Sequence, residues 1–271
     1  MPMRQRKKVA DLTLYILLVL LASMAVLLLV APTAIVVILS FTDGYSLKFP
    51  PQGFSLRWYE KLLDNEQLMS AGWNSVQVGL LCTVFSVVLG SAAALGISRS
   101  TSQWAKMLDT FFMSPLVLPA LAFGLAALMY FSTLGVPLSF STLVIGHTVL
   151  GVPYVIRTTT AALTQLPTVL LESSASLGAS KWYTLRKVTL PLIAPGIAAG
   201  AFICFMSSFD NIPVSLFLRD ASTDMLPIRM WQDLENRMDV SIAAISSVMV
   251  FFTVALMVCM EKLTGISRRM R

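Results

Sequence analysis

Two ionisable side chains, Asp210 and His147, stand within long apolar runs of the sequence. Asp210 is followed by Asn211 in "FICFMSSFDNIPVSLFL", and His147, the only histidine, lies in "IGHTVLGVPY". An ionisable group inside a bilayer is costly, and by default it marks the pathway of a solute or an ion. We therefore predict that Asp210, together with Asn211, lines a pathway that favours a cationic solute. In the alternative, Asp210 lies at the membrane surface, where it caps the next segment, or a partner chain neutralises it.

Neither Asp210 nor His147 has the companions that catalysis or metal binding requires. An intramembrane enzyme needs paired acids, a serine with a histidine or lysine, or clustered metal ligands. The two residues lie in different apolar runs, and no other chemical group accompanies them. The sequence thus predicts no catalytic residue, no metal site and no cofactor of its own. We interpret His147 as a hydrogen-bonded residue at a helix contact, with a role in transport as the alternative.

A hydrophilic segment, "LESSASLGASKWYTLRKVTLP" at residues 171–191, separates two of the apolar runs. Three of its residues are basic, Lys181, Arg186 and Lys187. Such a segment either lies on anionic lipid or forms a rigid projection that fits a cytoplasmic partner.

Proline and glycine positions predict two short helices in and before this segment. Pro167 suits the first turn of a helix that runs from Thr168 to Leu177. Gly178 supplies a left-handed stop, and a second helix from Ser180 to Val188 follows, until Pro191 ends it. The prediction is a compact knob of two helices joined at a glycine bend.

The amino-acid composition indicates which kind of fold holds these residues in place. The chain has 271 residues, of which 56% are hydrophobic and 13% charged, and its mean hydropathy is +0.76. This balance lies outside that of soluble globular proteins. A helix crosses the hydrocarbon core with about 20 mainly apolar residues. Six runs qualify, which predicts an all-α integral membrane protein: 12–41, 75–97, 110–131, 138–156, 195–218 and 241–260.

Basic residues predict the orientation of this membrane domain. The termini and the loops after the second and fourth runs hold 14 basic and 4 acidic residues, a net charge of +10. The opposite loops hold 6 basic and 10 acidic residues, a net charge of −4. Positive loops face the cytoplasm, so we predict that both termini are cytoplasmic. The overall charge of +6 is then a topology signal rather than a sign of nucleic-acid binding.

The domain boundaries follow from these runs. We predict a cytoplasmic N-terminus at 1–11, a membrane domain at 12–264 with the hydrophilic loop at 165–191, and a basic cytoplasmic tail at 265–271. The first run exceeds the roughly 7–15 apolar residues of a signal peptide and lacks a convincing cleavage site, so we interpret it as an uncleaved span. The three cysteines lie in apolar runs and imply no disulfide.

The fifth run carries a stripe of small residues. Gly196 and Gly200 form a G-x-x-x-G pair, which Cys204 and Ser208 continue, so another helix is expected to approach closely. Pro213 is predicted to break the helix beyond this stripe.

Two features lie in or next to the longest outer connection, residues 42–72. Ser55 can cap a short helix around Trp58, which is either an interfacial anchor or a docking site for an outer partner. Asn74 and Ser75, at the start of the second run, are interpreted as a helix cap, with a role in the pathway as the alternative.

The hydrophilic segment resembles a known signature, "EAA, three residues, G, nine residues, I, one residue, LP", of permease subunits of binding-protein-dependent ABC importers. Serines replace the two usual alanines, and a valine replaces the isoleucine. The resemblance extends over the chain, in the six spans, the loop length and stretches such as "NSVQVGL" and "HTVLGVPYVIRT". The matching positions are Glu172-Ser173-Ser174, Gly178, Val188 and Leu190-Pro191.

The resemblance implies the type I importer fold, in which the knob is a coupling helix that inserts into a groove on a nucleotide-binding subunit. No G-x-x-x-x-G-K-[ST] loop occurs in this sequence, so ATP and Mg are expected on a separate ATPase dimer. A second, different permease, a periplasmic solute-binding protein and the lipid of a bacterial inner membrane are the other expected partners. The residues implied in ATPase coupling are Glu172, Ser173, Ser174, Gly178, Ala179, Leu190 and Pro191.

The stretch "SFDNIPVS" resembles the acidic patch of polyamine-type permeases, in which two aspartates usually follow one another. Asn211 replaces the second aspartate. This resemblance implies a polyamine or a related organic cation as the solute. Similar permeases serve amino acid derivatives, opines, phosphonates, thiamine or ferric iron, which remain alternatives. A secondary transporter or a channel would also show several spans and an intramembrane acid, but it would not need the glycine-centred knob.

Overall fold

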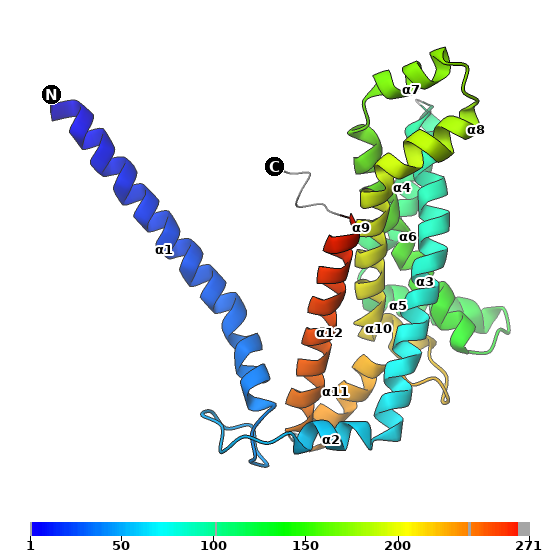
Figure 1. The fold of residues 1–271 in the computed structure, drawn as a ribbon. Coiled ribbons are helices and arrows are strands. Elements are labelled where there is room, and N and C mark those ends of the chain that lie inside the picture. Colours follow the sequence, from blue (N-terminus) through cyan, green and yellow to red (C-terminus); the bar gives the residue numbers. More distant parts are fainter. Residues whose placement is uncertain (1, 101, 238–239, 265–271) are drawn as a thin grey trace. The chain divides into compact units, whose positions relative to one another are not determined.

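The computed structural model describes residues 2–100, 102–237 and 240–264, and every regular element in these ranges is helical (Figure 1). The predicted all-α class is confirmed. The predicted tail at 265–271 lies outside the described residues. The elements, of which η1 is π-helical, are α1 (Pro2–Leu39), α2 (Arg57–Leu63), α3 (Glu66–Ser98), α4 (Gln103–Val117), α5 (Ala120–Thr133), α6 (Phe140–Thr164), α7 (Thr168–Ser176), α8 (Lys181–Thr184), η1 (Leu185–Thr189), α9 (Leu190–Phe209), α10 (Ile212–Leu218), α11 (Leu226–Arg237) and α12 (Ser241–Thr264).

The chain divides into two compact units. The smaller comprises Met1–Asp64 and Leu234–Val250, and the larger comprises Asn65–Asp233 and Phe251–Arg271. The predicted coupling knob and the predicted pathway residues all belong to the larger unit.

Within the smaller unit, Thr42 holds the segment between α1 and α2. Its hydroxyl oxygen accepts the backbone N–H groups of Gly44 and Gln52, at 3.2 and 3.1 Å. Its carbonyl oxygen accepts the indole N–H of Trp58 at 3.0 Å, and Trp58 is buried. Trp58 therefore anchors α2 to its own loop. The N-cap of α2 is Leu56 rather than the expected Ser55, whose hydroxyl accepts the N–H of Arg57.

Five helical segments are long and apolar enough to cross a membrane, or six spans if one bent pair of helices counts as a span. The count agrees with the six predicted runs, and the correspondence extends to their order. The five segments in the described residues are Leu12–Leu39, Glu66–Ser98, Phe140–Thr164, Lys181–Phe209 and Ser241–Lys262.

The third run departs from the prediction, because it is not one straight helix. The chain bends by 105° between α4 and α5. Leu118 between them is extended, with ψ 140°, and Pro119 follows it. A residue before proline is driven out of the helical region by the proline ring, so the break at 110–131 has a local steric cause.

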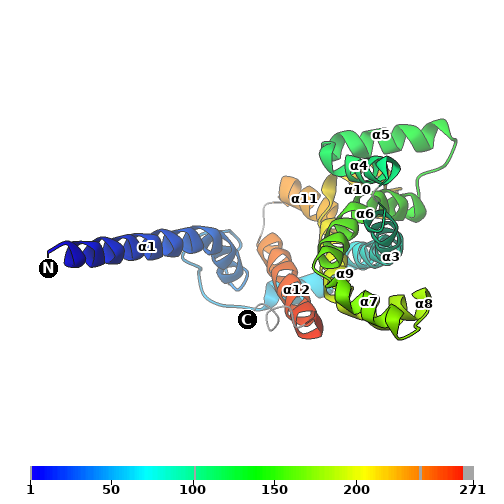
Figure 2. The ribbon, with the colours of Figure 1, turned by 90° about the horizontal axis from the view of Figure 1, so that it is seen from above.

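In the larger unit, α3, α6 and α9 pack against one another. Figure 2 shows α4 and α5 on one side of these three helices and α7 and α8 on the other. The small-residue stripe on α9 permits the close packing with α6, as expected. A Cβ atom at Gly196 would lie 2.5 Å from that of Ala162, and one at Gly200 would lie 2.3 Å from the Thr158 hydroxyl oxygen. Glycine is therefore needed where the two helices cross.

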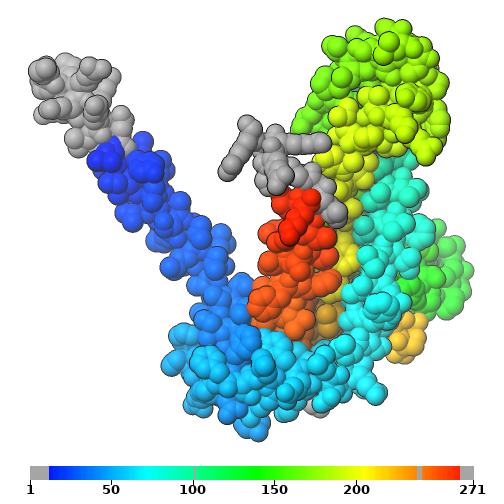
Figure 3. All heavy atoms as spheres, in the orientation of Figure 1, coloured from blue at the N-terminus to red at the C-terminus, as the bar shows by residue number. Residues whose placement is uncertain are grey.

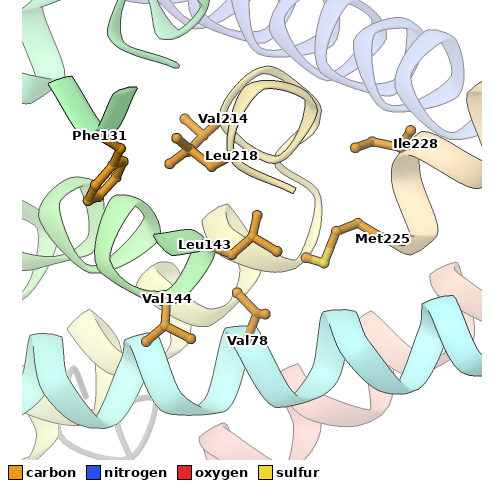
Figure 4. Packing of buried hydrophobic residues seen from close by; sticks show 8 residues of the cluster. All are labelled: Val78, Phe131, Leu143, Val144, Val214, Leu218, Met225 and Ile228. Carbon is orange, nitrogen blue, oxygen red and sulfur yellow. The ribbon is translucent and has the colours of Figure 1, made fainter. Parts of the chain in front are cut away.

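A hydrophobic cluster lies where α10 meets α3, α5 and α6 (Figure 4). Its members come from segments far apart in the sequence, so it holds the short helix α10 in place. They are Val78, Phe131, Leu143, Val144, Val214, Leu218, Met225 and Ile228.

Candidate functional site

The predicted coupling knob forms as two helices, α7 and α8, joined at Gly178. Gly178 has φ +80°, the left-handed conformation expected of the stop. The N–H of Ala179 bonds to the carbonyl of Ser174 at 3.1 Å, and the N–H of Gly178 bonds to that of Ala175 at 2.9 Å. This pair of bonds is the Schellman motif, which requires a left-handed residue at the position of the glycine. The bend is thus fixed by backbone hydrogen bonds.

The residues expected to contact an ATPase divide into exposed and internal ones. Glu172 and Ser173 are exposed on α7. Ser174 is buried, and its hydroxyl lies 2.8 Å from that of Thr184 on α8. Ser174 therefore joins the two helices of the knob and does not display its side chain.

An apolar surface accompanies the exposed polar residues of the knob. Leu177 is 88% exposed, the largest fraction among the large hydrophobic side chains of the described residues, and Trp182 is 67% exposed. Figure 3 shows the knob at the end of the larger unit, with its yellow-green surface free of the other helices of that unit. Large exposed apolar side chains on a projecting element are typical of a protein interaction site.

The second helix of the knob does not end at Pro191, which corrects the prediction. It begins at Lys181, after the N-cap Ser180, and passes through η1 directly into α9. The N–H of Leu190 bonds to the carbonyl of Leu185, five residues earlier. Because proline cannot donate a backbone hydrogen bond, the wider π-helical turn lets the chain pass Pro191 without a break. Leu190 and Pro191 thus lie inside one continuous helical segment, Lys181–Phe209.

The predicted pathway residues lie at the other end of this segment, between α9 and α10, which Figure 1 labels. α9 ends at Phe209, and Asp210 is its exposed C-cap residue, with φ −102° and ψ 16°. Asn211 caps α10, because its side-chain oxygen accepts the N–H of Val214 at 2.9 Å. The cap of the next segment is therefore Asn211 and not Asp210. The break precedes Pro213, which lies in the first turn of α10, where proline is well tolerated.

His147 lies at a helix contact, as predicted, and is 2% exposed. Its Nδ1 atom lies 2.8 Å from the Ser208 hydroxyl and its Nε2 atom lies 3.1 Å from the Ser215 hydroxyl. Ser208 belongs to α9 and Ser215 to α10, so one side chain of α6 connects the segments on both sides of Asp210. Among the residues described, no three His, Cys, Asp or Glu side chains gather as metal ligands.

Asn74 and Ser75 are not a helix cap, which corrects that interpretation. The N-cap of α3 is Asn65, and the two residues lie within the helix. The Asn74 amide donates to the Asp224 carbonyl at 3.0 Å, and the Ser75 hydroxyl accepts the N–H of Leu226 at 2.8 Å. They bind the segment between α10 and α11 to α3.

The segment between α10 and α11 also carries two acids with defined partners. Burial raises the pKa of Asp220, but the donors of Thr223 and Ser222 to its carboxylate outweigh burial and hold that pKa below its ordinary value. Asp224 lies 3.0 Å from the guanidinium of Arg219. The lowered pKa of Asp220 favours its ionised carboxylate in the segment that follows α10.

Sequence reasoning missed Ser208 and Ser215 as partners of His147. Their spacing of seven residues was no signal for this contact, because Ser208 lies in α9 and Ser215 in α10, on opposite sides of a break in the helix. The predicted site residues thus form two groups: the knob precedes α9, and Asp210 and Asn211 follow it. His147 bonds Ser208 and Ser215, on the two sides of the second group.

A family model described as "binding-protein-dependent transport system inner membrane component" matches residues 86–269. The chain is 28% identical over 234 residues to the spermidine/putrescine transport system permease protein PotC of Haemophilus influenzae, covering 86% of this chain and 90% of that protein. The identity to PotC of Escherichia coli K12 is 25% over 231 residues, with coverages of 85% and 87%.

The fold is similar to one chain of a bacterial alginate ABC transporter, solved in complex with an alginate-bound periplasmic protein. The TM-score is 0.69 at 17% identity, with 98% of this chain and 97% of that chain covered. The match to more than half of the sequence, together with the knob and the membrane helices, shows that the chain belongs to the family of binding-protein-dependent transport system inner membrane components.

Proposed function

We propose that this chain is a permease subunit that imports a polyamine or a related organic cation, with Asp210 in the solute pathway. The observation that carries the proposal is the position of Asp210, an exposed acid where α9 breaks within an otherwise apolar region. A carboxylate attracts an ammonium group, and this attraction is stronger where the local dielectric constant is low. The names of the PotC relatives support the same class of solute.

The energy for import comes from a separate ATPase dimer that holds ATP and Mg and docks on the α7–α8 knob. Glu172 supplies a charge and Leu177 and Trp182 supply apolar area on its exposed surface. Because ATP is hydrolysed in the cytoplasm, docking of the ATPase requires the knob to face the cytoplasm. With six spans, both termini then face the cytoplasm as well. A second permease and a solute-binding protein on the outer side complete the importer.

The mechanism follows from the continuity of Lys181–Phe209. Closure of the ATPase dimer moves the knob as a rigid body, because its bend is fixed by hydrogen bonds. A continuous helix transmits this displacement to Asp210, so the carboxylate changes its access from one side of the membrane to the other. Rigid-body movement of this kind is a general route for such transitions.

Uptake of labelled spermidine and putrescine by the reconstituted importer tests the proposal. Asp210→Asn removes the charge and keeps the shape, and loss of a charge-assisted bond is expected to raise KM about tenfold. Glu60→Gln is the matched control, since it removes an exposed acid from α2. Uptake kinetics of Asp210→Asn equal to those of the control would contradict the role of Asp210.

The class of solute is tested separately on the cognate solute-binding protein. A thermal shift with spermidine or putrescine is expected, and none with a phosphonate or thiamine. The reverse pattern would replace the polyamine by another solute of the same family and would leave the permease function intact.

A further inference from the structure

His147 is placed where it can set the position of Asp210. It is buried in α6, and its two ring nitrogens bond Ser208 and Ser215 at 2.8 and 3.1 Å. Ser208 precedes Asp210 by two residues on α9, and Ser215 follows it by five on α10. A single rigid ring therefore spans the break in which Asp210 lies.

The backbone alone does not fix the geometry of this break. The N–H groups of Asp210 and Asn211 bond back to the carbonyl oxygens of Met206 and Ser208 on α9, at 3.2 and 3.3 Å. These bonds hold both residues to α9, but the helical ladder does not continue from α9 into α10. The Asn211 cap fixes the start of α10 but not its direction relative to α9. Contacts with a third element must supply that direction.

α6 supplies these contacts along one face. The Thr142 hydroxyl lies 3.2 Å from the Leu218 carbonyl oxygen. A Cβ atom at Gly146 would lie 2.2 Å from a methyl carbon of Leu218, so α10 packs directly on this glycine. His147, next to Gly146, is the member of this face that also reaches α9.

We infer that His147 is the positioning residue for Asp210: by bonding Ser208 and Ser215 together, it fixes where the carboxylate stands relative to α6. The inference rests on the proposed role of Asp210 in the solute pathway. It goes beyond that role because it assigns the placement of Asp210 to a residue that does not touch the solute.

The chemistry of imidazole offers graded substitutions. Asparagine can replace the Nδ1 contact and glutamine the Nε2 contact, because their amide groups lie at corresponding distances from Cβ. His147→Asn is therefore expected to keep the bond to Ser208, and His147→Gln the bond to Ser215. His147→Phe keeps a ring of similar shape and loses both bonds.

Two measurements on the assembled importer in nanodiscs test the inference. The first is the labelling rate of Asp210→Cys by a membrane-impermeant maleimide, in a background in which Cys82, Cys204 and Cys259 are alanine. This rate reports the placement of residue 210 and needs no solute. The second is the KM and the maximal rate of spermidine uptake with Asp210 intact.

His147→Phe is expected to change the labelling rate several-fold. It is also expected to raise KM about tenfold with a smaller change in maximal rate, since two intramembrane hydrogen bonds are lost. Ser208→Ala and Ser215→Ala should each have a smaller effect, and neither should add to that of His147→Phe. Thr148→Val is the control, because the buried Thr148 hydroxyl donates within α6, at 2.7 Å to the Val144 carbonyl oxygen.

The outcomes separate the two proposals. If His147→Phe leaves both the labelling rate and KM at the control values, His147 is not a positioning residue. If the labelling rate changes while Asp210→Asn transports normally, the positioning role stands and the pathway role of Asp210 fails. If His147→Phe does not assemble, His147→Asn and His147→Gln replace it, because each keeps one bond. Their labelling rates and KM values are then compared with those of the control.

Discussion

The hydroxyl of Ser174 on α7 lies 2.8 Å from the hydroxyl of Thr184 on α8. This bond joins the two helices of the knob at a point away from the Gly178 bend. The two helices of the knob are thus connected twice, by the chain at Gly178 and by the bond between Ser174 and Thr184. Such a body can be moved by a partner without changing its shape.

Ser174→Ala is expected to loosen the knob. Loss of one hydrogen bond costs about 1 kcal/mol, which corresponds to about fivefold weaker binding of the ATPase subunit if the open knob does not dock. Thr184→Val should weaken binding equally, and the double variant should be no worse than either single variant. Ser176→Ala, at an exposed position of α7 that is not among the residues expected to contact the ATPase, is the control for loss of a hydroxyl. Affinity measured by titration of the ATPase into nanodiscs decides the matter, and purely additive losses would argue against the bond.

Substitution of Gly178 should act through the backbone alone. Nothing lies within 4 Å of a Cβ atom at this position, but its φ of +80° is unfavourable for side chains. Gly178→Val is expected to cost about 1–2 kcal/mol and to weaken ATPase binding about tenfold. Gly178→Asn should cost less, because asparagine enters the left-handed region more readily. Both are measured by co-purification with the ATPase and by transport-coupled ATP hydrolysis. Equal losses for the two variants would indicate that space, not conformation, is limiting.

Ser75→Ala should destabilise the unit at the end away from the knob. The substitution leaves the buried N–H of Leu226 without its acceptor, which costs about 1–3 kcal/mol. Ser91→Ala on the same helix is the control, because the Ser91 hydroxyl is buried and has no hydrogen-bond partner among the described residues. The thermal midpoint of the purified protein is expected to fall for Ser75→Ala and to stay unchanged or rise for Ser91→Ala. The same midpoint for both variants would contradict a stabilising role of the bond between Leu226 and Ser75.

The knob was predictable because its determinants are local. A left-handed glycine, a serine N-cap and a short amphipathic helix are each specified within a few residues. Gly178 therefore takes the predicted left-handed position, and the second helix begins at Lys181, one residue after the predicted start at Ser180. The close approach at Gly196 and Gly200 was predictable for a similar reason, since small side chains in a membrane helix favour packing whatever the partner is.

The prolines show where sequence reasoning stops. Pro115 lies inside α4, Pro119 follows a break, and Pro191 lies inside a helical segment. Each residue has the same covalent constraint, but the outcome depends on whether neighbouring carbonyl groups find other donors, as in the π-helical turn before Pro191. Those partners are set by the fold and are not visible in the local sequence.

Asn74 and Ser75 were misinterpreted for a related reason. Polar residues near the start of an apolar run have the composition of a cap whether or not they serve as one. Their true partners, Asp224 and Leu226, lie about 150 positions away along the chain. Only the folded structure distinguishes a cap from a tertiary contact.

The helical segment Lys181–Phe209 has 29 residues, about 43 Å of continuous helix, with the knob at one end and Asp210 at the other. Each residue of an α-helix turns the chain by about 100°, so the number of residues sets the rotational phase between the two ends. The π-helical turn at Leu185–Thr189 holds one residue more than an α-helical ladder would need. Deletion of one residue from this turn is therefore expected to preserve the rotational phase between the knob and Asp210. A deletion elsewhere in the segment would rotate Asp210 by about 100° relative to the knob.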